Sequence, residues 1–297
     1  MEVRLGLRSR LRECSFSVKQ ASALSICLCV LLGGACADDD DRWNRAQMKI
    51  AARASTLRHS FDDRAKPDSS RLAAGRGLLR LDPEFLASRY AEHPRLVRAL
   101  IDEAVSARDT VGLPLVARLF ELRGGEERID FEVDLIAFGA AARGRLVEML
   151  DRPDRSLVVR AAETLARTGA DEAAADIGGL LVHADDWIRM GAAHALGQLG
   201  TEAATDALLA ALTDTAYVVV NAALVGLASQ QAASAYDPAL ALLEDGRPEV
   251  RKHAAHALGQ IGDPAALGPL QQVSRDDPDS GVRFMASRAV QALSGER

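Results

Sequence analysis

Apolar and polar positions in the second half of the chain follow a helical period and recur at a fixed spacing of about 31 residues. The anchors of this repeat, with one extra residue before the last, are Leu157, Ile188, Val219, Val250 and Val282. Small or apolar residues follow each anchor after four and eight positions. Examples are Ala192 and Leu196 after Ile188, and Ala254 and Leu258 after Val250. These offsets place the residues on one face of a helix.

A second apolar register follows each of these helices, so each repeat holds two helices. Its leucines keep the same period at Leu150, Leu181, Leu212 and Leu243. Glycine, which tolerates positive φ, closes the first helices at Gly169, Gly200 and Gly262. One helix pair cannot bury both of its apolar faces, so neighbouring pairs must stack. The sequence therefore predicts an all-α protein, an α-solenoid of stacked antiparallel helix pairs.

One stretch of 15 residues, Asp186–Gly200, returns almost unchanged at 250–262. The shared residues of the first copy are Ile188, Arg189, Ala192, Ala193, Ala195, Leu196, Gly197 and Gly200. This pattern resembles the HEAT-repeat superfamily, in particular the short HEAT-like units of phycobilisome lyases. The resemblance is strong over 155–297 and weaker over 80–154. It implies a solenoid whose second helices line the inner curve, where partners usually bind, but it implies no particular function.

The first 35 residues have the pattern of a secretory signal peptide, with basic residues before a short apolar stretch at 21–35. Residues 31–36, Leu-Leu-Gly-Gly-Ala-Cys, resemble a bacterial lipoprotein signal. This resemblance implies that Cys36 is lipidated and becomes the first mature residue. The alternative is cleavage after Ala37, which would release a soluble periplasmic or secreted protein that begins at Asp38.

We therefore predict an exported protein held on a membrane surface by a lipid at Cys36. Ala37 stands where the lipoprotein resemblance would place an inner-membrane retention aspartate, which favours the outer membrane. Without residues 1–35 the chain has 31 basic and 40 acidic residues, a net charge of about −9. This balance argues against a nucleic-acid partner.

Four regions follow from these patterns: 1–35 as signal peptide, 36–79 as lipid-attachment cysteine, acidic run and tether, 80–154 as degenerate repeats, and 155–297 as HEAT-like repeats with a capping helix at the end. Residues 42–61 predict a basic amphipathic helix that lies on a membrane, packs on the first repeat or is only partly ordered. Residues 62–77 predict a flexible linker. Helices are expected at 83–90, 94–107 and 112–123, and another with Ile129, Val133 and Ala137 on its apolar face.

Candidate chemistry is sparse. His253 and His256 are spaced to share a metal ion on one helix, but no third ligand with a recognisable spacing is nearby. Deoxyhypusine hydroxylases, which this repeat resembles, hold iron with His-Glu pairs, and this chain has no His-Glu dipeptide. We therefore expect no catalytic residue, no cofactor and no metal site. The equivalent repeat positions Glu163, His194, Val225, His256 and Arg288 are interpreted as an outward-facing series.

Arg189, Arg251 and Arg283 each follow an anchor directly. They form either a ridge that binds an acidic partner or a ladder of ion pairs with aspartates near helix starts. We predict a non-catalytic, membrane-tethered scaffold that binds another protein. The alternatives are a HEAT-like enzyme, lyase-type or metal-dependent, and a purely structural envelope component.

Overall fold

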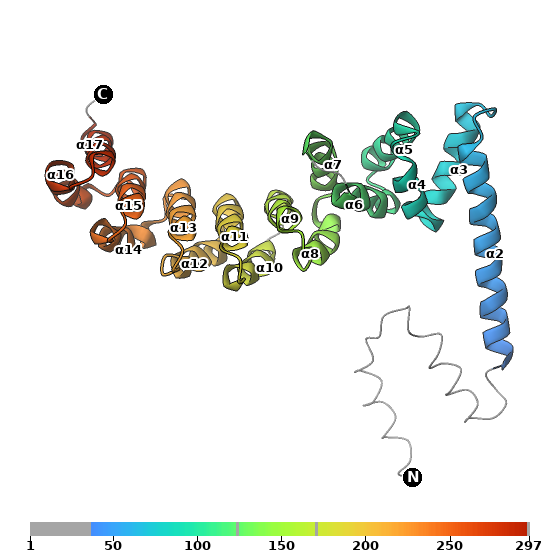
Figure 1. Cartoon of the computed structure of the whole chain (residues 1–297), viewed down its shortest axis with the longest axis horizontal. Helices are drawn as coiled ribbons and strands as arrows, with labels where there is room; N and C mark the ends of the chain where they lie inside the picture. Colours follow the sequence, from blue (N-terminus) through green and yellow to red (C-terminus); the bar gives the residue numbers. More distant parts are fainter. Residues whose placement is uncertain (1–36, 123–124, 170–171, 296–297) are drawn as a thin grey trace, which may run out of the picture.

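The computed structural model describes residues 37–122, 125–169 and 172–295, which form helices joined by short turns (Figure 1). No strand occurs in these ranges, and the predicted all-α solenoid is confirmed. The expected signal peptide and Cys36 lie outside the described residues.

Each unit of the strong repeat pairs a long first helix with a shorter second helix. The first helices are α9 (Arg155–Arg167), α11 (Asp186–Leu199), α13 (Tyr217–Ser229), α15 (Pro248–Ile261) and α17 (Ser280–Ser294). The second helices are α8 (Arg143–Leu150), α10 (Ala173–Gly178), α12 (Glu202–Ala211), α14 (Tyr236–Ala241) and α16 (Leu267–Asp276). Short 3-10 turns lead into or extend several of them: η2 (Gly139–Ala142), η3 (Gly179–Val182), η4 (Ala233–Ala235), η5 (Leu242–Glu244) and η6 (Pro264–Ala266).

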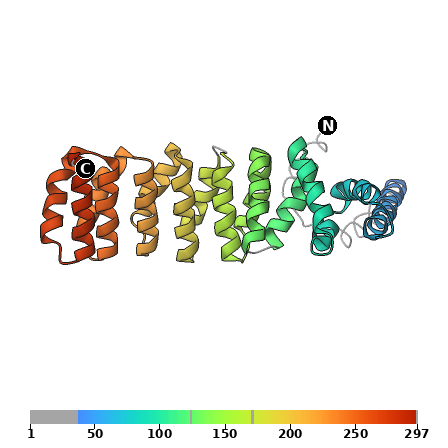
Figure 2. The same ribbon diagram turned by 90° about the horizontal axis from the view of Figure 1, so that it is seen from above.

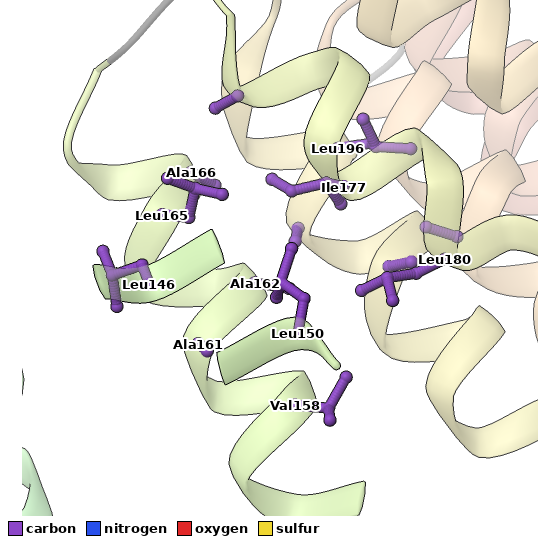
Figure 3. Packing of buried hydrophobic residues seen from close by; sticks show 14 of the residues in the cluster. Leu146, Leu150, Val158, Ala161, Ala162, Leu165, Ala166, Ile177, Leu180 and Leu196 are labelled. Carbon is purple, nitrogen blue, oxygen red and sulfur yellow. The ribbon is translucent and has the colours of Figure 1, made fainter. Parts of the chain in front are cut away.

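The anchor stripe of the first helices lies in the core. Relative exposure is at most 5% for Leu157, Ile188, Val219, Val250, Val282, Ala192, Ala254, Leu196 and Leu258. Figure 3 shows how the units share this core, with Leu146 and Leu150 of α8 beside Ala161 and Leu165 of α9. Each fully buried leucine contributes about 1.5–3 kcal/mol by leaving water. Buried residues of all these units belong to one cluster, so the core runs continuously along the stack.

Helix ends follow the local chemistry of the sequence. Gly200 and Gly262 adopt φ of 65° and 82° and end α11 and α15, because only glycine takes this conformation without a Cβ clash. Asp154, Asp185 and Asp279 accept hydrogen bonds from backbone N–H groups in the first turns of α9, α11 and α17. These caps satisfy donors that a helix start leaves unpaired.

The stack bends toward its first helices, so the expectation that second helices line the inner curve is wrong. In Figure 1 the row dips in the middle, with the first helices on the inner side and the second helices on the outer side. First helices of successive units also contact one another extensively, whereas successive second helices do so sparsely. We call the solvent side of the first helices the inner face and that of the second helices the outer face.

Small residues explain the direction of this bend. A Cβ on Gly197 of α11 would lie 2.8 Å from the Cα of Gly226 of α13. A Cβ on Gly259 of α15 would lie 2.8 Å from the Cβ of Ala289 of α17. Such contacts let the first helices approach more closely than the second helices, and the stack curves toward the closer layer.

The N-terminal part consists of α2 (Ala37–Asp62), α3 (Asp68–Leu81), α4 (Pro83–Arg89), α5 (Pro94–Ala107), η1 (Thr110–Gly112), α6 (Leu113–Leu122) and α7 (Gly125–Phe138). The helices expected at 83–90, 94–107 and 112–123 are confirmed. The flexible linker expected at 62–77 is wrong, because α3 occupies most of it. Gly75 of α3 packs so closely on Leu100 and Phe61 that a Cβ would lie 2.5 Å from Leu100 Cδ1. Glycine there serves packing and not flexibility.

Helix α2 has two halves with different surroundings. Ala54 and Phe61 in its second half are buried, and Arg71 Nε of α3 donates a hydrogen bond to the Phe61 carbonyl at 2.8 Å. Trp43 and Ile50, on the continuation of the same stripe, are exposed. Figure 1 shows α2 projecting from the end of the solenoid, and Figure 2 shows it almost end-on beside the near-parallel first helices.

The apolar face predicted for α7 is wrong at Val133 and Ala137, and the side chain of Ile129 lies outside the described part of the chain. Val133 is 60% exposed and Ala137 is exposed, whereas Phe131, Leu135 and Phe138 of α7 are buried. Helix α7 is rotated about its axis relative to this prediction, because its charged side chains form ion pairs with helices on either side. These partners lie far away in the sequence.

Candidate functional site

The inner face carries the outward series predicted from the repeat. Its members are Glu163, His194, Val225, His256 and Arg288, of which His194, Val225 and Arg288 are exposed and the other two half-buried. Along the stack this series therefore changes from a carboxylate on α9 to a guanidinium on α17. Among the described residues, Arg288 of α17 and Lys252 of α15 form no ion pair.

The outer face differs in charge. Exposed acidic residues recur on the second helices and their extensions: Glu148, Glu202, Asp206, Asp237 and Glu244. The first helices α15 and α17 instead carry Lys252 and Arg288, which form no ion pair among the described residues, against one acidic residue, Glu249. The net charge of −6 is thus distributed unevenly, and the inner face toward the C-terminal end is basic.

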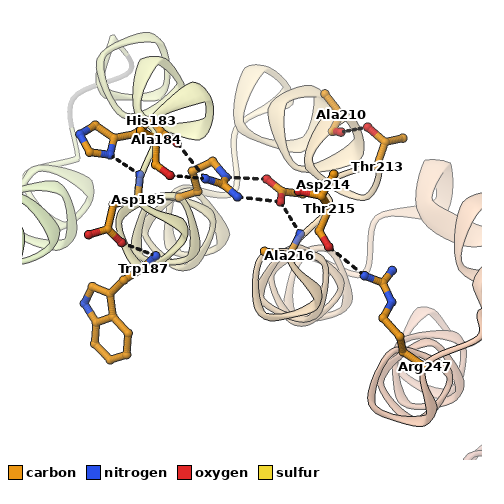
Figure 4. A network of polar contacts seen from close by, with 11 residues as sticks. His183, Ala184, Asp185, Trp187, Ala210, Thr213, Asp214, Thr215, Ala216 and Arg247 are labelled. Carbon is orange, nitrogen blue, oxygen red and sulfur yellow. Dashed lines mark hydrogen bonds and ion pairs between the residues drawn. The ribbon is translucent and has the colours of Figure 1, made fainter.

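The three candidate ridge arginines do not point freely into solvent. Arg189 of α11 bonds Asp214 through both ends of its guanidinium, with Nε–Oδ2 at 2.7 Å and Nη2–Oδ1 at 3.0 Å. Its Nη1 donates to the His183 carbonyl at 2.8 Å (Figure 4). The side chain is only 14% exposed.

Arg251 repeats this arrangement two periods further along the stack. Its Nε and Nη2 bond the two carboxylate oxygens of Asp277 at 2.8 and 2.9 Å, and its Nη1 donates to the Asp245 carbonyl. Arg283 donates through Nη1 to the Asp277 carbonyl at 2.7 Å. The geometry is therefore that of the structural ladder, in which each arginine joins its helix to a neighbouring inter-helix turn.

These bonds shift the titration of both carboxylates. The hydrogen bond from Arg189 lowers the pKa of Asp214, and the hydrogen bond from Arg251 lowers the pKa of Asp277, against a smaller opposing effect of burial. Bidentate arginine–carboxylate pairs are short and directional, so they fix the angle between successive units.

A narrow groove opens on the inner face between α15 and α17. It has a volume of about 130 Å³ and is lined by His256, Gly259, Gln260, Met285, Arg288, Ala289 and Ala292. Gly259 and Ala289 both line it, and a Cβ on Gly259 would lie 2.8 Å from the Cβ of Ala289. No lining residue is acidic. Sequence reasoning did not predict this groove, because it depends on how closely two first helices approach.

Wider grooves open on the outer face, where the second helices are further apart. One of about 530 Å³ lies between α8 and η3 and exposes Val182 beside Leu180. Another of about 670 Å³ lies between α14 and α16, with Leu240 and Val273 on its walls and Glu244 and Asp276 among its lining. Both combine apolar walls with acidic residues.

Within the described residues, His253 and His256 have no third potential metal ligand beside them. His253 Nδ1 lies 2.8 Å from the Glu249 carbonyl of its own helix. No three His, Cys, Asp or Glu side chains come together as metal ligands within the described ranges. Within the same ranges, no helix is both long and apolar enough to span a bilayer.

Two buried carboxylates of α7 were missed by the sequence reasoning. Glu132, 2% exposed, accepts from Arg167 at 2.6 Å and from Arg160 at 3.4 Å, both on α9. Asp134, 4% exposed, forms a bidentate pair with Arg98 of α5 at 2.7 Å, which raises the pKa of that arginine. Acidic residues are rarely buried unless paired, and the partners lie 28–36 residues away.

Comparison with known structures finds other helical repeat proteins. Human deoxyhypusine hydroxylase in complex with glycerol is 19% identical, with a TM-score of 0.39 over 84% of this chain and 99% of that chain. The complex of CpcE and CpcF of phycocyanin lyase from Nostoc sp. is 18% identical, with a TM-score of 0.36 over 72% and 95%. A designed armadillo repeat protein is 20% identical, with a TM-score of 0.40 over 65% and 99%.

No curated protein sequence matches the chain. The sequence model of HEAT repeats matches residues 145–228 and 221–293, which together span half of the 297 residues. These matches cover the units from α8 to α17, whose helix pairs, glycine ends and shared core are described above. The chain therefore belongs to the HEAT-repeat family.

Proposed function

We propose that this protein is a non-catalytic scaffold that binds an acidic segment of another protein along its inner face. The supporting observation is the charge of that face. Toward its C-terminal end it is basic and partly apolar, while the outer face and the chain as a whole are acidic. Complementary charge favours encounter with an acidic partner and disfavours a basic one. The ladder arginines support this role indirectly, because they hold the units at fixed angles.

We further propose that Cys36 carries a lipid that holds the scaffold at a membrane. Helix α2 includes Ala37, the residue after this cysteine, so the chain would leave the anchor as a helix. Its 26 residues span about 39 Å at a rise of about 1.5 Å per residue. The solenoid would then stand away from the bilayer with its inner face open to a partner.

Site-specific photo-crosslinking in cells tests the partner proposal. A photoreactive amino acid at Gln198 or Val225, both exposed on the inner face, should capture one reproducible partner. The same probe at Ala210 or Glu244, both exposed on the outer face, is the matched control. Equal capture from both faces, or none from either, would reject the inner face as the binding surface.

The anchor has a separate test. The Cys36→Ser variant should move from the membrane fraction to the soluble fraction, and mass spectrometry of the wild type should find a lipid on the peptide that begins at Cys36. An unmodified peptide that begins at Asp38 would instead establish ordinary signal cleavage.

A further inference from the structure

The groove between α15 and α17 has the shape of a small binding site. Gly259 and Ala289 both line it, and Gly259 has no side chain where Ala289 approaches. His256 and Gln260 line it from α15, and Arg288 lines it from α17. Its volume of about 130 Å³ suits a side-chain carboxylate with its methylene groups.

The groove concentrates nitrogen donors without an acid to neutralise them. The pKa of His256 is lowered by burial first and then by the charges of His253 and Arg288. These are the charged groups that act on His256, and α13 on the other side of α15 carries no charged residue. Arg288 is exposed and has no ion pair within residues 37–122, 125–169 and 172–295.

Equivalent positions in the other repeats lack this combination. The pair that corresponds to His256 and Arg288 is His194 and Val225 between α11 and α13, which has one ring and one aliphatic side chain. Between α9 and α11 it is Glu163 and His194, which includes a carboxylate. The cationic groove is therefore a property of the last two first helices and not of the repeat itself.

We propose that this groove binds an Asp or Glu side chain of an acidic peptide segment. The inference rests on the proposed function and names the chemistry that the inner face recognises. Arg288 bonds the carboxylate, and His256 becomes protonated as the anion enters and supplies a second charge-assisted bond. Gln260 donates an amide hydrogen, and Met285 packs on the methylene groups.

Proton linkage gives the proposal a measurable sign. An anion in the groove stabilises the charged form of His256, so its pKa rises on binding. Binding therefore takes up a proton at His256. Because protons are more abundant at low pH, the peptide binds more tightly there. An acidic peptide should bind about fivefold more tightly at about pH 5.5 than at about pH 8.

The test uses the full chain in detergent, labelled with ¹³C at histidine, with NMR of the ring signals. The probe is the peptide acetyl-Glu-Glu-Glu-Glu-amide, and acetyl-Gln-Gln-Gln-Gln-amide is the uncharged control. We expect the Glu peptide to move the His256 signal and raise its pKa, while His194 serves as an internal reference that stays unchanged. His256→Gln assigns the signal.

The substitution R288Q should weaken binding of the Glu peptide by about tenfold, the effect of losing one good charged bond. An unmoved His256 signal, or equal binding by R288Q, would overturn the proposal. An equal response to inorganic phosphate would also overturn it, because the groove would then be a general anion site. A positive titration with no partner captured at Gln198 or Val225 would leave this site standing and reject the proposed function.

Discussion

At the residue scale, the glycines between first helices decide how closely the units pack, and Gly197 gives a sharp test. Alanine is normally better than glycine inside a helix by about 0.5–1 kcal/mol. Here the new Cβ would lie 2.8 Å from the backbone of Gly226, which cannot rotate away. We expect Gly197→Ala to lower the free energy of unfolding by about 1–3 kcal/mol in urea titrations.

Gly144 of α8 is the matched control, because no atom lies within 4 Å of its added Cβ. The Gly144→Ala variant should be neutral or more stable by up to about 1 kcal/mol. If both substitutions changed the unfolding free energy in the same direction, close packing would not be what requires glycine at 197.

The ladder pairs predict a pH dependence at the same scale. Because the folded pKa of Asp277 lies below its ordinary value, its pair with Arg251 stabilises the protein above about pH 4. This contribution is lost as the pH falls through the lowered pKa. Arg251→Gln should cost about 1–3 kcal/mol of unfolding free energy at neutral pH and clearly less near pH 2.

Urea titrations at both pH values measure this difference. Arg145→Gln is the control, since Arg145 pairs with Glu148 on the surface and its loss should change stability by less than about 1 kcal/mol. A cost for Arg251→Gln that is independent of pH would mean that the bond to Asp277 is not the cause.

At the element scale, α2 joins a packed half to a projecting half. Phe61 is fully buried and meets Phe85 and His93 edge-on, so Phe61→Ala should cost about 3–5 kcal/mol of unfolding free energy. Ile50 is exposed, and Ile50→Ala should change the free energy of unfolding by less than about 0.5 kcal/mol.

Hydrogen exchange measures the same division within α2 directly. Amides at 43–50 should exchange much faster than amides at 54–62, because a helical segment without tertiary contacts is only marginally stable. Equal protection along the whole helix would contradict this division and would indicate that the projecting half is covered by another surface.

At the scale of the whole molecule, α7 links the N-terminal helices to the strong repeats. Its Glu132 bonds Arg160 and Arg167 of α9, while its Asp134 bonds Arg98 of α5. Stability in a solenoid depends on contacts between neighbours, so loss of one junction should uncouple the two sides. We expect Glu132→Ala to lower the free energy of unfolding by about 1–3 kcal/mol. We also expect this variant to unfold in two separate steps.

Hydrogen exchange across a urea series reports each side separately, with peptides from 83–122 and from 186–295. The control is the surface variant Glu148→Ala, in which we expect both sides to unfold at the same urea concentration, as in the wild type. Coincident unfolding of both sides in Glu132→Ala would show that apolar contacts alone couple them.

Much of this architecture is local and follows from the amino-acid sequence alone. The spacing from Leu157 to Val282 sets the period, and Gly200 and Gly262 end their helices through backbone conformations that depend on no distant contact. The outward series that includes His194 and Arg288 follows from the same helical geometry. The pattern therefore predicted the helix pairs, the core stripe and the solenoid.

Contacts between units set the direction of curvature, the register of α7 and the groove between α15 and α17. Each depends on what a residue meets in another unit: Gly197 meets Gly226, Glu132 meets Arg160, and Gly259 meets Ala289. From the sequence alone, the same small and charged residues could contact several different residues in neighbouring units. Close packing and buried charge allow only one of them, because an overlapping atom or an unpaired buried charge costs several kcal/mol.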